Sequence, residues 1–273
     1  MRTIVLCLLL SIQVLRGYPQ TYKTLVGGVY TRLTAYAPHF SDAFSFSGNQ
    51  AALASVESFS AGVFGERRFL LQELSLYQTA VALPTKSGNF GLQGTYSGSV
   101  NYNESGIGLA YARKLGTTVA IGAQFNYHTV KVAGYGTAGT VNVEGGVLFH
   151  FSEKLTGGLH AYNPASSKFG KGEERLPGIY TAGIGYEASP QFFISGEVLK
   201  TEDQPVSVNA GIQYGFSETL FARGGVNSAT SIFYFGAGIL LKGFRLDATA
   251  SIHPQLGLTP GLMLVYGNKK RKP

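Results

Sequence analysis

Short segments with alternating side chains recur along most of this chain, and this alternation limits the folds that the chain can adopt. In the clearest segment Phe244, Leu246 and Ile252 fall on one parity, while Arg245 and Asp247 fall on the other. Successive side chains of a β-strand point to opposite faces of the sheet. Each such segment therefore predicts a strand with one apolar face and one face of small or polar residues.

Fourteen segments of this kind lie between residues 59 and 267, with turn-forming residues between them. After the first 17 residues no stretch approaches the roughly 18 apolar residues of a membrane-spanning helix, whereas a strand of a membrane barrel needs only about 9–11. We expect strands near 59–68, 71–84, 89–98, 105–114, 119–131, 140–151, 155–163, 178–188, 191–200, 206–216, 220–228, 231–241, 243–253 and 258–267.

The second face of these segments separates a water-soluble β-sandwich from a membrane barrel. A sandwich would carry many charged residues there, but this face is mainly Gly, Ala, Ser, Thr, Asn and Gln, and only 14% of the chain is charged. Small polar residues suit an enclosed lumen, and ring closure satisfies the backbone hydrogen bonds that lipid cannot. The predicted fold class is all-β, a transmembrane antiparallel up-and-down β-barrel of about 14 strands with a short N-terminal plug, embedded in outer-membrane lipid.

Residues 1–17 have the composition of a cleaved secretory signal, with Arg2 before an apolar run. The single cysteine, Cys7, lies in this leader, so the mature chain has no disulfide and fits a Gram-negative envelope better than a disulfide-stapled secreted domain. A membrane anchor and a lipoprotein cysteine are the weaker alternatives, because the run is short and little of it precedes Cys7. We expect the chain to be exported to the outer membrane.

The net charge of +7 lies mostly at the two ends of the chain. Arg2 and Arg16 belong to the leader, and four basic residues occupy 269–272, so the body of the chain is nearly neutral. No nucleic-acid partner is therefore predicted. An even number of strands puts both ends on the periplasmic side, where residues 268–273 form a solvated tail or, alternatively, bind anionic headgroups, a partner or peptidoglycan-associated material.

Residues 18–58 do not follow the strand rhythm. A turn at Gly48-Asn49 is followed by a short alanine-rich run that favours a helix. We expect this segment to fold inward as a plug or to lie on the periplasmic side. The candidate plug residues are Asn49, Gln50, Ala51, Ala52, Leu53 and Ala54.

The run from Asn49 to Ala54 resembles the Asn-Pro-Ala-Ala-Leu-Ala segment that precedes the first strand in the FadL-like superfamily of outer-membrane barrels, which includes the PorV and PorQ proteins of Bacteroidota. Gln50 stands where this superfamily often has proline. The resemblance covers roughly residues 40–267 and implies a fourteen-stranded barrel with an N-terminal hatch. Further segments similar to the same superfamily are 64–69, 82–85, 158–164 and 175–177.

No catalytic constellation is apparent, so we expect no enzyme activity, no cofactor and no metal. The five histidines lack the spacing of a helical metal pair and are better explained as polar filling of the lumen. Charged residues on the polar face could tune a selective pore, although internal ion pairs that rigidify a closed barrel are the favoured interpretation. The residues expected to face the lumen are Glu66, Gln124, Asn126, His128, Glu144, Glu187, Glu197, Arg245 and Asp247.

Two functional classes follow from these observations. In the first, the barrel is a scaffold subunit of outer-membrane secretion or protein-assembly machinery, as the PorV resemblance implies, with other outer-membrane or periplasmic proteins as partners. In the second, it is a FadL-like channel for small or hydrophobic solutes, with a hydrophobic small molecule as ligand. The chain is short for FadL-like transporters, and its short connections and small-residue lumen favour the scaffold.

Overall fold

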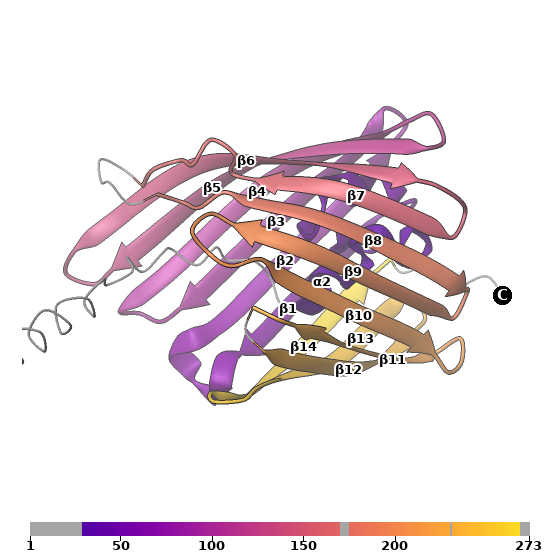
Figure 1. Ribbon diagram of the computed structural model, residues 1–273. Helices are drawn as coiled ribbons and strands as arrows, with labels where there is room; N and C mark the ends of the chain where they lie inside the picture. Colours follow the sequence, from indigo (N-terminus) through magenta and orange to yellow (C-terminus); the bar gives the residue numbers. More distant parts are fainter. Residues whose placement is uncertain (1–28, 170–174, 230, 268–273) are drawn as a thin grey trace, which may run out of the picture.

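The computed structural model describes residues 29–169, 175–229 and 231–267. These residues form a closed antiparallel barrel of fourteen strands in which each strand pairs with its neighbours in sequence (Figure 1). The ring closes where β1 (Ser60–Arg67) pairs with β14 (Gly257–Tyr266). The predicted fold class and strand number are confirmed, whereas the predicted leader and basic tail lie outside the described residues.

The observed strand bounds fall within four residues of the predicted ones. The largest difference at a strand start is at β2, because Gln72–Leu74 form a 3-10 turn, η7, instead of the first residues of the strand. A matching difference occurs at β6, which starts earlier than predicted. The remaining strands are β2 (Ser75–Thr85), β3 (Gly88–Gly98), β4 (Tyr102–Leu115), β5 (Val119–Val132), β6 (Gly136–His150), β7 (Leu155–Tyr162), β8 (Ile179–Ser189), β9 (Phe192–Thr201), β10 (Ser207–Gly215), β11 (Leu220–Asn227), β12 (Ile232–Leu241) and β13 (Phe244–His253).

The outer face of the barrel carries large apolar side chains that no part of the described chain covers. Leu109 is 61% exposed and Leu262 is 62% exposed, while polar side chains of the other parity, such as Arg245 and Asp247 in β13, are buried. An apolar outer face with a polar interior is the arrangement of a membrane barrel. Exposed tyrosines of this face include Tyr96, Tyr111, Tyr127, Tyr186, Tyr214 and Tyr266.

The two ends of the barrel differ in their connections. We call the end with the short connections, where Gly267 follows β14, the turn end, and the opposite end the loop end (Figure 1). At the loop end the connection between β7 and β8 is the longest, and its described parts fold inward. Phe169 and Leu176 of this connection are buried against Tyr162 and Ile179. The loop end is therefore partly covered by the chain's own connection.

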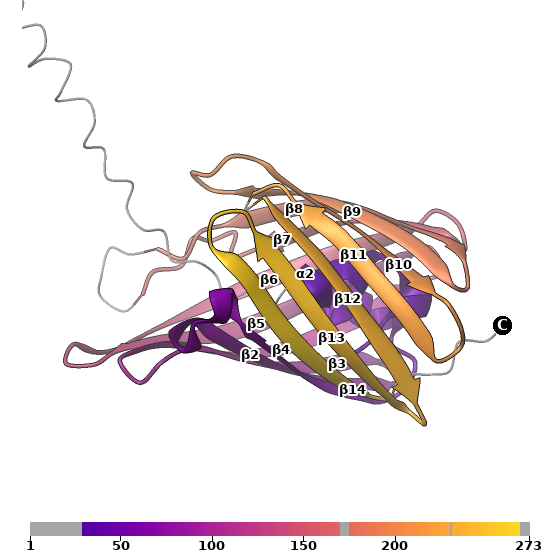
Figure 2. The same ribbon diagram turned by 90° about the horizontal axis from the view of Figure 1, so that it is seen from below.

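Residues 29–56, here called the plug, lie inside the ring of strands (Figures 1 and 2). Phe44, Phe46 and Leu53 of the plug are fully buried. The wall around them is apolar, with Phe64 and Met263 pointing inward, so the expected polar lining is interrupted at the level of the plug. The plug consists of α2 (Val29–Arg32) and four 3-10 turns, η2 (Leu33–Tyr36), η3 (Pro38–Phe40), η4 (Ser45–Ser47) and η5 (Gln50–Ser55).

Among the residues that the structure describes, no helix is both long enough and apolar enough to cross a membrane.

Candidate functional site

The candidate plug residues form the turn η5 and the residue before it. Asn49 is extended, and its side-chain oxygen accepts a hydrogen bond from the backbone N–H of Ala51 at 3.0 Å, which caps the turn. Gln50, Ala51, Ala52 and Leu53 are buried, and Ala54 is half-buried. The structure thus places all six candidate residues inside the barrel.

The plug backbone lies directly on the inner wall at β5 and β6. A Cβ atom added to Gly122 would lie 2.4 Å from the carbonyl carbon of Gln50, and one added to Gly146 would lie 2.0 Å from Oδ1 of Asn49. These two glycines face each other in the β5–β6 register. Only a residue without a side chain allows the plug to approach this closely.

Hydrogen bonds from side chains fix both ends of η5 to the wall. At its start, Asn49 Nδ2 donates to the carbonyl oxygen of Leu159 in β7 at 3.0 Å. At its end, Asn89 Nδ2 in β3 donates to the carbonyl oxygens of Leu53 at 2.7 Å and Val56 at 2.8 Å. Asn89 is buried and was not predicted as a site residue. It supplies a donor to the Val56 carbonyl group and a second donor to the Leu53 carbonyl group, which also accepts the backbone N–H of Val56 at 3.1 Å.

A buried charge cluster joins the plug to the opposite wall. Arg245 of β13 forms an ion pair with Asp42 of the plug at 2.7 Å and with Asp247 at 3.2 Å. Asp247 is fully buried and also pairs with Arg223 of β11. The two guanidinium groups and two carboxylates balance one another, as a buried charge cluster must.

A second ion pair links the start of the plug to β9. Arg32 Nη2 lies 3.3 Å from Glu197 Oε2, and the same carboxylate accepts a hydrogen bond from the Tyr36 hydroxyl at 3.4 Å. Asn209 of β10 donates to the other oxygen of Glu197 at 3.1 Å. Burial raises the pKa of Tyr36 well above its usual value, and the Glu197 charge adds to this, so the hydroxyl remains a donor.

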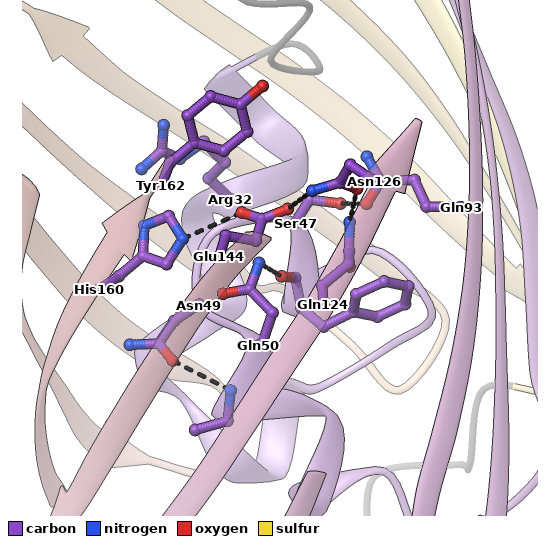
Figure 3. A network of polar contacts seen from close by, with 12 residues as sticks. Arg32, Ser47, Asn49, Gln50, Gln93, Gln124, Asn126, Glu144, His160 and Tyr162 are labelled. Carbon is purple, nitrogen blue, oxygen red and sulfur yellow. Dashed lines mark hydrogen bonds and ion pairs between the residues drawn. The ribbon is translucent and has the colours of Figure 1, made fainter. Parts of the chain in front are cut away.

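Between the plug and the loop end, polar side chains of β5, β6 and β7 form a chain of hydrogen bonds (Figure 3). Gln124 Nε2 donates to Asn126 Oδ1 at 2.7 Å, and Asn126 Nδ2 donates to Glu144 Oε1 at 2.8 Å. His160 Nε2 lies 3.0 Å from the other oxygen of Glu144. Beside them, His128 Nε2 lies 3.2 Å from the Tyr162 hydroxyl. These side chains line a lumenal cavity of about 50 Å³, and Arg32 and Ser47 form its wall on the side of the plug.

A larger cavity, of about 670 Å³, lies on the turn-end side of the plug. Its wall includes His39 and Phe40 of the plug and Glu187 of β8. The backbone N–H of His39 donates to Glu187 Oε1 at 3.0 Å, and its ring nitrogen bonds the other carboxylate oxygen. The plug therefore separates a small polar cavity from a wider one that lies next to the short turns.

The structure buries all nine residues that were expected to face the lumen, but it distributes them over several sites. Gln124, Asn126 and Glu144 form one network. His128 lies beside this network, Arg245 and Asp247 belong to the charge cluster, and Glu187 and Glu197 contact the plug separately. Glu66 stands apart, where it accepts a hydrogen bond from Arg68 at 2.8 Å.

Several charged or polar residues of the site escaped the sequence prediction, among them Arg223, Asn89, Asp42 and Arg32. Arg223 and Asn89 have lumenal parity in their strands and could have been found from it. Asp42 and Arg32 belong to the plug, where no periodicity marks the side that faces the wall.

Comparison with known proteins bears on the fold. No protein-family model matches the chain, and no curated protein sequence matches it. The crystal structure of a Pseudomonas aeruginosa FadL homologue matches with a TM-score of 0.65 and 10% identity, over 84% of this chain and 94% of that chain. The barrel has the fold of FadL-like outer-membrane proteins. The Pseudomonas putida toluene transporter TodX matches with a TM-score of 0.62 and 9% identity, over 89% of this chain and 98% of that chain.

A third FadL-like match is the CymD monoaromatic hydrocarbon channel, with a TM-score of 0.58 and 11% identity over 84% of this chain and 93% of that chain. At these identities the likeness concerns the fold. The narrower resemblance to PorV and PorQ proteins stays a prediction from the sequence. Within the described residues no cluster of three or more His, Cys, Asp or Glu side chains is arranged to hold a metal ion.

Proposed function

We propose that this protein is an outer-membrane channel that carries small molecules through a plugged β-barrel. The observation that supports this most is the combination of a FadL-like barrel with a plug that separates two lumenal cavities. A cavity on each side of a removable obstruction is what a channel with a controlled passage requires. The apolar outer face supplies the belt that contacts outer-membrane lipid.

The fold neighbours favour a channel over the scaffold role that the sequence placed first. TodX and CymD are described as a toluene transporter and a monoaromatic hydrocarbon channel. The channel, which was the alternative from the sequence, is therefore the better-supported function for this chain.

Passage through this barrel requires the plug to move. Phe44, Phe46 and Leu53 do not line an opening, because all three are fully buried in the core between plug and wall. The ion pairs of Arg32 with Glu197 and of Asp42 with Arg245 hold the plug in this position. We propose that solutes pass when these contacts open on one side of the lumen.

Reconstitution of the purified full chain into lipid vesicles tests this function. Vesicles that contain the protein are expected to swell faster than empty vesicles in solutions of small solutes. The double substitution Arg32→Ala and Asp42→Ala, which removes both plug ion pairs, is expected to increase the swelling rate further. Glu218→Ala, a change at an exposed acidic residue of the turn between β10 and β11, serves as the control and should leave the rate unchanged.

Swelling no faster than that of empty vesicles, for both the parent chain and the double variant, would contradict a channel. Folding of each variant is checked by the difference in gel migration between unheated and heated samples. If such an inactive barrel also copurified from native membranes with another envelope protein in a fixed ratio, the scaffold role would replace the channel.

A further inference from the structure

One strand of the wall, β8, runs past the plug from one lumenal cavity to the other. Ile179 and Thr181, toward the loop end, line the small cavity, and Glu187, toward the turn end, lines the large one. The residues of the same inner parity between them are Gly183 and Gly185. Because β8 places no side chain on the inner face between the two cavities, the plug must close the lumen there.

Tyr36 of the plug fills this bare stretch of β8. The three atoms nearest to a Cβ added at Gly183 all belong to the Tyr36 ring and its hydroxyl group. The three nearest to a Cβ added at Gly185 are the carbonyl carbon, the carbonyl oxygen and the Cβ of Tyr36. Tyr36 is only 2% exposed, so almost no solvent reaches it. A single plug residue thus occupies the interval between the cavities along this strand.

The neighbouring strands place small or polar residues beside this stretch. The residues in register with the two glycines are Gly158 and Thr156 of β7 and Glu197 and Ser195 of β9. None of them carries a large apolar side chain that could take the place of the Tyr36 ring. If Tyr36 moved away, the path along β8 would therefore be lined by small and polar groups, which suits small hydrophilic solutes.

We propose that solutes cross the plug along the inner face of β8 and that Tyr36 is the gate, which this structure holds closed. This inference rests on the proposed channel function and names the residue that controls it. The Tyr36 hydroxyl donates to Glu197 at 3.4 Å, and Arg32 pairs with the same carboxylate at 3.3 Å. Opening of the ion pairs of Arg32 and Asp42 would let Tyr36 leave β8, while η5 stays on β5 and β6.

Replacement of the Tyr36 ring tests the gate by vesicle swelling in glycerol. Tyr36→Ala removes the ring over Gly183 and the packing that keeps the Tyr36 carbonyl against Gly185, so swelling should be several-fold faster than with the parent chain. Tyr36→Leu, which lacks the outer ring atoms but keeps more apolar packing, is the second variant should the first not fold. Tyr36→Phe keeps the ring and should swell at the parent rate.

Tyr30→Ala is the matched control for the loss of a ring. Tyr30 is also a plug tyrosine that is 2% exposed, but it packs against Phe64 and Tyr234, and none of the three lines either cavity. This variant should swell at about the parent rate. Equally fast swelling of Tyr30→Ala and Tyr36→Ala would overturn the gate, because any hole in the plug would then let solutes through. Folding of every variant is checked by the difference in gel migration between unheated and heated samples.

A disulfide across the gate tests whether Tyr36 must leave β8. A Cβ at Gly185 would lie 2.9 Å from that of Tyr36, so Tyr36→Cys with Gly185→Cys brings two thiols within bonding reach after a small shift. With Cys7 replaced by serine, oxidation should reduce swelling to the rate of empty vesicles, and reduction should restore it. The control pair Ala35→Cys with Gly48→Cys has the same Cβ separation of 2.9 Å but lies within the plug, so its oxidation should not change the rate. Thiol titration verifies each disulfide, and unchanged swelling after oxidation of the first pair would overturn the gate.

The outcomes separate this inference from the proposed function. A permeable parent chain whose swelling responds neither to loss of the Tyr36 ring nor to the disulfide would support the channel and contradict the gate. An impermeable parent chain that Tyr36→Ala makes permeable, and Tyr30→Ala does not, would support the path along β8 and contradict the channel function of the parent chain. Swelling no faster than that of empty vesicles for both the parent chain and folded Tyr36→Ala would contradict both.

Discussion

The plug is held by two sides of the barrel wall in different ways. On the side of β5, β6 and β7 its backbone lies against glycines, and the side-chain amide of Asn49 in the plug donates to the Leu159 carbonyl of the wall. On the side of β11 and β13 it is held by the cluster of Asp42, Arg245, Asp247 and Arg223. The first side, which we call the glycine side, depends on fit, and the second, which we call the charge side, depends on electrostatic balance.

This difference suggests which side of the plug opens. A close backbone fit has no titratable or exchangeable group and is lost only when the chains separate. An ion pair can instead exchange its partner for water or for a solute as the local environment changes. We therefore expect the charge side to open first and the glycine side to act as the fixed support.

The strongest test of this comparison is Asp247→Asn on the charge side. The substitution leaves Arg223 and Arg245 with a single carboxylate, that of Asp42, so the free energy of unfolding should fall by about 3–5 kcal/mol. Denaturant titration of the folded barrel in micelles measures this change. Adding Arg223→Met should recover part of the loss, since Arg245 then balances Asp42. A single variant as stable as the parent chain would show that the cluster does not hold the plug.

On the glycine side, Gly122→Ala should destabilise the barrel by about 1–3 kcal/mol, because the new Cβ collides with the backbone of Gln50. The plug should also become more accessible to proteases. Gly145→Ala is the matched control, because a Cβ there meets its nearest neighbour at 3.5 Å. Similar losses in the two variants would mean that the effect comes from the strand and not from the plug.

Asn89→Leu sharpens the comparison, because it removes polar anchoring from η5 without touching a charge. The Val56 carbonyl group would lose the Asn89 donor, and the Leu53 carbonyl group would keep only the backbone N–H of Val56, so the free energy of unfolding should fall by about 2 kcal/mol. Asn103→Leu is the control, since that amide makes a single bond, to the Ser99 carbonyl near the loop end. A larger loss of stability in Asn103→Leu than in Asn89→Leu would show that Asn89 does not anchor the plug.

The smallest expected effect is that of Tyr36→Phe. The hydroxyl bond to Glu197 is long, at 3.4 Å, and Glu197 keeps its contacts with Arg32 and Asn209, so the loss should be about 1 kcal/mol or less. The same denaturant titration measures it. If Tyr36→Phe lost as much stability as Asp247→Asn, the main electrostatic contact of the plug would be with β9 and not with β13.

The strands were predictable because lipid and lumen impose opposite demands on alternate residues, and this leaves a period of two in the sequence. The same parity located Arg245 and Asp247. Arg223 has the same lumenal parity but was missed, because its strand also places Phe221 on the inner face, where the aromatic ring lies beside the guanidinium groups of Arg223 and Arg245. A large apolar side chain on the inner face makes the polar face of a strand harder to recognise.

The contacts of the plug could not be predicted from the sequence, for a different reason. That Gly122 lies beside Gln50, or that Asp42 meets Arg245, depends on strand register and on the path of an irregular segment through the ring. Neither leaves a local pattern. The alanine-rich run from Gln50 onward indicated a short helical turn but not the wall on which it rests.

The seam between β1 and β14 has a consequence for biogenesis. The plug runs directly into β1, and Ser60 bonds the carbonyl of Tyr266 across the seam at 3.1 Å. The plug also contacts β5 early in the chain and β13 near its end, so its seat is complete only when almost every strand has been made. Pairing of β14 with β1 and enclosure of the plug therefore occur together in the last step of assembly. Before that step, the incomplete sheet must keep the plug beside it.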